Sequence, residues 1–212
     1  MPTRYLIFIT FIVYACASKK TITNYSQIIL QYREIYKNDF IENPRSPLIK
    51  EDLPYLDFFP VDENWRLKCS CHLVKDAKPF ELPTYSGVTR TYIHHSTAKC
   101  IYKKQYLTLS LYKNIHQPVN PLYKNHLFLP FKDESNGDTT YGGGRYLNLM
   151  DTDIIDGIIE IDFNKSYNPW CAYSDGFNCP IPPKDNHLPL EILAGEKEYK
   201  GKYKKRILDH NN

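Results

Sequence analysis

Residues 65–73, WRLKCSCHL, decide the fold that this chain is expected to adopt. The odd-numbered positions of the segment are apolar, and the even-numbered positions carry Arg66, Lys68, Ser70 and His72. Successive side chains of an extended chain point to opposite faces, so this alternation gives one apolar and one polar face. The segment therefore predicts a half-buried β-strand.

Short runs of similar composition follow along the chain and are separated by turn residues at fairly regular intervals. They cover residues 88–94, 98–103, 106–112, 127–131, 145–149, 158–163 and 188–193. Many short strands with frequent turns are typical of antiparallel sheets that pack or close on themselves. We therefore expect a mainly β fold, an antiparallel β-sandwich or barrel-like domain with a long ordered C-terminal loop.

Helical spacing precedes the strands. Apolar residues between Tyr25 and Tyr36 recur every three or four positions, which predicts one N-terminal amphipathic helix lying across the domain. Ser46 followed by Pro47 is a favourable helix start, because Ser caps the first turn and Pro is preorganised there. We expect a short helix from this point, limited by Pro54.

The N-terminal segment indicates where the protein is located. Arg4 precedes the apolar run YLIFITFIVY, residues 5–14, which suits a signal-peptide core and is too short to span a bilayer. The run leads into VYAC, residues 13–16, which resembles a bacterial lipobox. By this resemblance Cys16 is diacylated after cleavage and anchors the protein in a membrane. The alternative is an ordinary secreted protein.

These features give an expected organisation of the chain. Residues 1–15 would be a lipoprotein signal peptide, 16–24 a lipidated tether, 25–200 a single β-rich domain, and 201–212 a basic polar tail. Because Ala17 and not Asp follows Cys16, we expect the outer membrane, with the domain facing the periplasm. The formal net charge of +3 gives no electrostatic basis for binding nucleic acid.

A polar and glycine-rich block between Phe131 and Lys197 is the expected place of a site, since a segment needed only for core packing would alternate apolar and polar residues. In this hypothesis Arg145 pairs with oxygen atoms of a small anionic or sugar-like ligand. The alternative is a structural ion pair between Arg145 and an aspartate. The candidate ligand-binding residues are Asp133, Asn136, Thr140, Tyr141, Arg145, Asp162, Asn164 and Tyr167.

We expect neither a metal ion nor a cofactor. Two acidic segments, beginning at Asp133 and Asp151, do not place oxygen ligands and a glycine at the spacing of a calcium loop. Gly142–Gly144 could approach an anion, but no Lys-Ser/Thr pair follows as in a phosphate-binding loop. A turn for the acidic segment at Asp151, and a bulge for the glycines, are the preferred explanations.

Four of the cysteines suggest disulfides, because the expected compartment is oxidising. Cys171 and Cys179 lie at the two ends of a proline- and asparagine-containing loop and are expected to pair. Cys69 and Cys71 share one face of the first strand, so either of them can pair with Cys100, which leaves one thiol free.

Several motifs resemble a known family. They are SPL (46–48), DFFPVDENWR (57–66), TYGGGRY (140–146), DFNKSYNPWCAY (162–173), CPIPPKDNHL (179–188) and AGEK (194–197). They are similar to the family catalogued as domain of unknown function 1684, which is widespread in bacteria and archaea. The resemblance covers nearly the whole mature chain and implies no established activity.

Three functions remain open at this point, and whether the protein is an enzyme is one of the open questions. The preferred one is an envelope lipoprotein that binds a small ligand near Arg145. The second is a hydrolase in which Asp133 or Asp162 acts as general base, although no G-x-S-x-G or H-E-x-x-H motif is present. The third is an envelope assembly factor with an exposed aromatic patch around Trp170, Tyr173 and Phe177.

Overall fold

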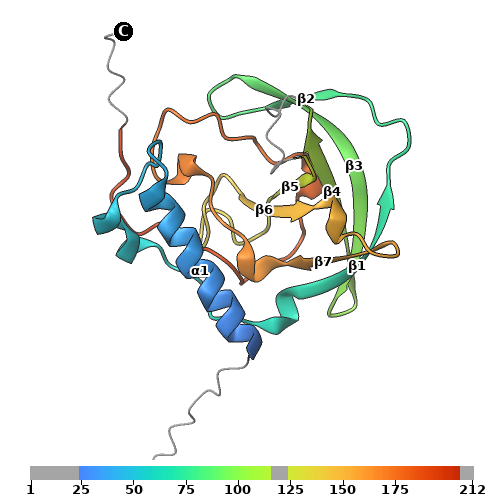
Figure 1. Ribbon diagram of the computed structural model, residues 1–212, viewed down its shortest axis with the longest axis horizontal. Coiled ribbons are helices and arrows are strands. Elements are labelled where there is room, and N and C mark those ends of the chain that lie inside the picture. Colours follow the sequence, from blue (N-terminus) through green and yellow to red (C-terminus); the bar gives the residue numbers. More distant parts are fainter. Residues whose placement is uncertain (1–23, 116–123, 206–212) are drawn as a thin grey trace, which may run out of the picture.

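A single antiparallel sheet, curled into a half-barrel, dominates the computed structural model (Figure 1), which describes residues 24–115 and 124–205. The strand order is β6-β5-β4-β3-β1-β7, and β2 pairs with β3 beside this path. The mainly antiparallel β fold is therefore confirmed. The strands are β1 (Arg66–Leu73), β2 (Phe80–Pro83), β3 (Thr89–Tyr102), β4 (Gln105–Asn114), β5 (His126–Phe131), β6 (Arg145–Met150) and β7 (Ile158–Asp162).

Strand β1 follows the predicted alternation and lies between β3 and β7. Leu67, Cys69 and Cys71 point into the core, where they meet apolar side chains of β3, β4 and β7. A disulfide joins Cys69 to Cys100 on the neighbouring strand. Cys71 is the free cysteine of the described residues, and it is buried.

Three strand predictions differ from the structure. Strand β3 runs without a break through both segments 88–94 and 98–103, with a shift of register between His94 and Ser96. Strand β2 was not predicted, because its four residues, FELP, include a proline. Residues 188–193 form no strand: the backbone of Ile192 is held by buried polar side chains in place of a neighbouring strand.

Helix α1 (Asn24–Glu42) is longer than the predicted segment and lies on the opposite side of the molecule from β3 (Figure 1). It buries Ile29, Arg33 and Phe40. The helix expected at Ser46 is wrong: the Ser46 hydroxyl bonds the backbone of Leu48, and a 3-10 helix, η1, begins later, at Lys50–Tyr55. Within the described parts of the chain, no helix is long and apolar enough to cross a membrane.

Short 3-10 helices lie between the strands and within the C-terminal loop. They are η2 (Glu63–Trp65), η4 (Asp151–Asp153), η5 (Phe163–Lys165), η6 (Trp170–Ala172) and η7 (Lys184–Asn186). Asn186 at the end of η7 inserts its side chain between β4 and β5: its Oδ1 accepts from the Ser110 N–H, and its Nδ2 donates to the carbonyls of Ser110 and Pro130. This side chain replaces strand-to-strand bonds, which explains why only Tyr112 and Phe128 pair directly there.

The polar centre of the fold is the ion pair between Arg145 and Asp133, whose side chains are both fully buried and 2.8 Å apart. Arg145 also donates to the carbonyls of Ile192, Ala194 and Glu196, which fixes the C-terminal loop against β6. Burial lowers the pKa of Arg145, and the charge of Asp133 opposes that shift. The two terminal nitrogens of the guanidinium are thus satisfied by the protein itself, while the buried Nε has no hydrogen-bond partner among the described residues.

We expect Arg145→Met to destabilise the fold by about 3–5 kcal/mol, because it leaves the Asp133 carboxylate buried without its cation. Urea unfolding followed by circular dichroism measures this loss. Arg66→Met is the matched control: Arg66 pairs with Glu160 at a partly exposed position, and its loss should cost less than about 1 kcal/mol. Equal effects of the two substitutions would contradict a structural role for the buried pair.

Candidate functional site

Four of the eight predicted ligand-binding residues form one internal network around Arg145. Asp133 Oδ1 accepts from the backbone of Ser135 and of Ile192, while its Oδ2 faces Arg145. Asn136 bonds Thr140 Oγ1 at 2.8 Å and closes the turn between them. The network is buried apart from a half-buried Asn136, and its hydrogen bonds are to other parts of the protein.

Asp162 and Asn164 form a second buried network beneath the start of α1. The Tyr25 hydroxyl donates to Asp162 Oδ1 at 2.9 Å, and Asn164 Nδ2 donates to the same carboxylate and to the Asp62 carbonyl. This network fastens the helix to the end of β7. Neither network gives a ligand direct access to its carboxylate, because the Asp133 side chain is fully buried and Asp162 as a whole residue is only 5% exposed.

The two predicted tyrosines lie in different places. Tyr141 packs beside Gly143 and donates to the Cys171 carbonyl at 3.4 Å. Tyr167 instead lines a large groove of about 1270 Å³ that lies between α1, the sheet and the C-terminal loop. Tyr167 is the one predicted ligand-binding residue on the groove wall, so the candidate site lies to one side of the Arg145 network.

Aromatic rings make up much of the groove lining, and charged, amide and imidazole side chains lie among them. The aromatic lining residues are Tyr32, Tyr36, Phe40, Tyr92, Phe128, Tyr146, Tyr167, Trp170 and Phe177. Large hollows lined by apolar and aromatic groups, with a small number of placed polar groups, are typical of ligand-binding sites. The groove is therefore our candidate functional site.

The sheet supplies its part of the lining through four strands: Asn114 at the end of β4, and pairs of alternate residues on β3, β5 and β6. Arg90 and Tyr92 on β3, His126 and Phe128 on β5, and Tyr146 and Asn148 on β6 all face the groove. In each pair the two residues are two positions apart, so they share one face of the sheet. Pairs of this kind were the signal in the sequence that could have identified the groove.

A hydrogen-bond chain crosses the groove wall. Asn148 Oδ1 accepts from the Tyr167 hydroxyl at 2.9 Å and lies 3.0 Å from His126 Nε2. Both partners thus use the oxygen of the amide, which turns Asn148 Nδ2 away from them. Burial lowers the pKa of His126, which favours the neutral ring. Asn148 is itself exposed, and its Nδ2 has no protein acceptor within the described residues.

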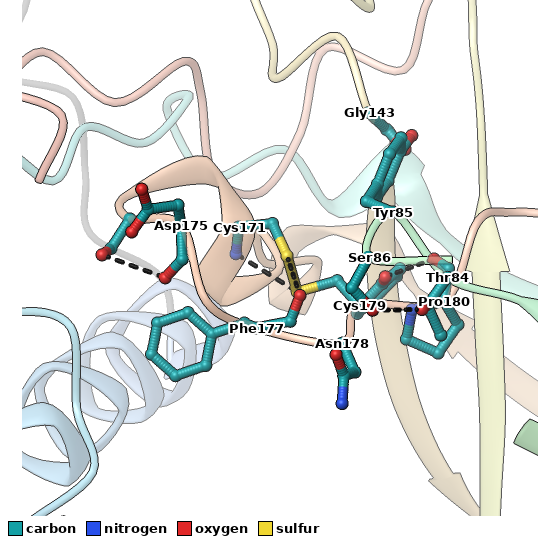
Figure 2. Close-up of a disulfide and its surroundings, with 12 residues drawn as sticks. Thr84, Tyr85, Ser86, Gly143, Cys171, Asp175, Phe177, Asn178, Cys179 and Pro180 are labelled. Atoms are coloured by element: carbon teal, nitrogen blue, oxygen red, sulfur yellow. Dashed lines mark hydrogen bonds between the residues drawn. A yellow bond between two sulfur atoms is a disulfide. The ribbon is translucent and has the colours of Figure 1, made fainter. Parts of the chain in front are cut away.

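The rim of the groove is a loop stapled by the Cys171–Cys179 disulfide (Figure 2). Phe177 inside this loop and Trp170 directly before Cys171 meet edge to face, with ring centroids 5.1 Å apart. The far end of the loop is tied to the segment after β2, where the Tyr85 N–H donates to the Cys179 carbonyl. The disulfide and this bond hold the rim in place against the sheet.

The helix side of the groove depends on Glu196, a fully buried carboxyl group. Tyr36 of α1 donates to Glu196 Oε2 at 2.9 Å, the Asn168 N–H donates to the same oxygen, and Tyr173 donates to Oε1 at 2.7 Å. Burial raises the pKa of Glu196 to about 7, although these three donors act in the opposite direction. Glu196 lies in the AGEK segment that carries part of the family resemblance, but it was not among the predicted site residues, since nothing in the local pattern of the loop indicates a role for it.

This pKa predicts a pH dependence of stability. Because the pKa of Glu196 in the folded state lies above its ordinary value, the folded state binds the proton more tightly than the unfolded state does. The stabilisation is present below about pH 4.5 and is lost as the pH rises to about 7, by an amount on the order of 3 kcal/mol.

Urea unfolding at several pH values tests this. Glu196→Gln, which cannot ionise, should flatten the decline of unfolding free energy over that interval, whereas Glu34→Gln on the exposed face of α1 should leave it unchanged. An unaltered slope in the Glu196 variant would show that the carboxyl titrates normally.

Metal binding has no support in the part of the chain that the structure describes, where no group of three or more His, Cys, Asp or Glu residues could hold an ion. The acidic segment at Asp151 forms η4, the turn between β6 and β7 that was the preferred explanation. The Gly142–Gly144 segment is a turn before β6 and not the expected bulge, because the Gly144 N–H bonds back to the Tyr141 carbonyl. At Gly144, φ is +90° and a Cβ atom would lie 2.6 Å from the Phe131 carbonyl oxygen, so only glycine fits.

Comparisons with known proteins agree with the fold and name no activity. No curated protein matches the chain. The solution NMR structure of an uncharacterized protein from Haloarcula marismortui is similar, with 30% sequence identity and a TM-score of 0.64 over 82% of this chain and 94% of that one. Residues 51–197 match the family described as "Protein of unknown function (DUF1684)". The chain therefore belongs to the DUF1684 family.

Proposed function

We propose that this protein is a lipid-anchored binding protein of the cell envelope that holds a sugar-like ligand in the aromatic groove. The observation that carries the proposal is the groove itself, about 1270 Å³ of hollow with nine aromatic rings and a hydrogen-bond chain on its wall. The proposal moves the ligand from the surroundings of Arg145 to the groove and keeps Tyr167 as a contact.

The chemistry of the wall fits a polyhydroxylated ring. The C–H face of a sugar is apolar and packs on an aromatic face, and its hydroxyl groups need partners at the edge. Asn148 Nδ2 is such a partner, since its orientation is set by the bonds that His126 and Tyr167 make to its Oδ1. Arg90 donates to the Asn178 carbonyl at 3.3 Å and contributes further donors from strand β3 of the same sheet.

The location in the envelope rests on the sequence. Cys16 lies outside the described residues, and α1 begins eight residues later, at Asn24. An extended segment of that length spans at most about 26–29 Å, so a lipid on Cys16 would keep the groove close to the membrane surface. Two disulfides among the described cysteines are in keeping with an oxidising compartment.

The other two hypotheses gain less support. A hydrolase with Asp133 or Asp162 as base needs an accessible carboxylate, and the bonds of both are made to buried protein groups. The aromatic patch of the assembly-factor hypothesis is divided, because Tyr173 is fully buried while Trp170 and Phe177 belong to the groove rim.

A glycan array of neutral and acidic oligosaccharides, followed by calorimetry on the hits, tests the proposed function. We expect Asn148→Ala to weaken binding about tenfold, the effect of one lost hydrogen bond of about 1–1.5 kcal/mol. Asn64→Ala is the matched control, because its side chain bonds Asp62 beside η2, outside the groove lining.

Tryptophan fluorescence gives an independent readout. Trp65 is buried in the core at 4% exposure, so a change on ligand addition should come from Trp170 and disappear in Trp170→Phe. Absence of binding to every glycan by folded protein would refute the proposal.

A further inference from the structure

A second, smaller hollow of about 250 Å³ lies at one end of the groove. Pro44, Arg45 and Phe177 line both hollows, so the two adjoin along the segment that follows α1 and the groove rim. Its remaining lining residues are Ser46, Pro47, Ser174, Lys204 and Lys205.

The charges of the smaller hollow are all of one sign. Its lining holds Arg45, Lys204 and Lys205 and no carboxylate. Lys204 is neutralised by an ion pair with Asp52. The side chains of Arg45 and Lys205 have no hydrogen-bond or ion-pair partner among the described residues. Two uncompensated positive charges in a concave site favour an anionic group.

The hydroxyl groups in the smaller hollow are already engaged. Ser46 donates to the Leu48 carbonyl, and Ser174 donates to the Asp175 carbonyl. The positive side chains are therefore the groups that would hold an anion. The main groove differs in this respect, because its lining includes two carboxylates, Asp39 and Glu42 of α1.

The backbone fixes the position of the basic residues. Lys204 pairs in parallel with Ser174: its N–H donates to the Tyr173 carbonyl at 2.9 Å, and its carbonyl accepts from the Asp175 N–H at 3.3 Å. The last described residues thus lie against the disulfide-stapled rim loop, which places Lys204 and Lys205 in the lining of the smaller hollow.

We propose that the ligand is an acidic saccharide, whose rings lie in the groove and whose carboxylate or phosphate group lies in the smaller hollow. Arg45 contacts both parts of the ligand, because it lines both hollows, and Lys205 adds the second charge. The proposal rests on the proposed function and names the chemical class of its ligand.

Calorimetric titration of the full folded chain with two tetrasaccharides tests the proposal. Tetragalacturonate carries a carboxylate on every ring, and its methyl ester has the same chain of rings without the charges. We expect the acid to bind at least about tenfold more tightly than the ester at low salt, with the difference shrinking as salt is raised. Arg45→Gln combined with Lys205→Gln should remove that preference, so that acid and ester bind this variant with equal affinity.

Two control variants separate the outcomes. Lys202→Gln removes an exposed charge outside both hollows and should preserve the preference, whereas Asn148→Ala should weaken acid and ester alike. Equal binding of acid and ester, or a preference that survives the double substitution, overturns the acidic ligand and leaves the groove as a sugar site. If neither these probes nor any acidic or neutral glycan of the array binds, the proposed function and this inference fail together.

Discussion

The buried pair of Arg145 and Asp133 is the constraint on which the C-terminal half of the structure depends. A guanidinium without exposure to water needs an acceptor for nearly every N–H, because an unpaired buried charge is costly. Asp133 supplies one acceptor, and the carbonyls of Ile192, Ala194 and Glu196 supply the others. The loop that carries these carbonyls is therefore held in one course across the end of the sheet.

That course determines where Glu196 lies, and through Glu196 it determines where α1 lies. Residues 192–196 hold the carboxyl beneath the helix, where Tyr36 and Tyr173 donate to it. Gly195 makes the approach possible: its φ is +76°, and a Cβ atom would lie 2.7 Å from the Phe163 carbonyl oxygen. The position of α1, and with it one wall of the groove, thus depends on the Arg145–Asp133 salt bridge on the other side of the loop at residues 192–196.

The sequence predicts the strands well and the site poorly, for one physical reason. Alternation is a local property, so β1, β4, β5, β6 and β7 can be identified from consecutive residues. The groove is assembled from α1, four strands and a loop near residue 177, and no local sequence pattern indicates that these elements meet. The polar block at residues 131–197 was identified as unusual. Its many polar residues serve buried hydrogen bonding around Arg145 and Asn164 more than an exposed site.

The same block explains how the half-barrel is completed. The edge strands β6 and β7 do not pair, but the chain leaving β7 crosses to β6 within five residues, and Tyr167 forms both backbone bonds of a bridge with Tyr146. Backbone groups of a loop at such a junction have few strand partners, so side chains must satisfy them. The Asn168 side chain donates to the Lys197 carbonyl, and the Asn186 side chain donates to the Ser110 carbonyl between β4 and β5. Side chains and a short bridge thus take the place of a closing strand between β6 and β7. One face of the sheet is left without a covering strand, and that face forms a wall of the groove.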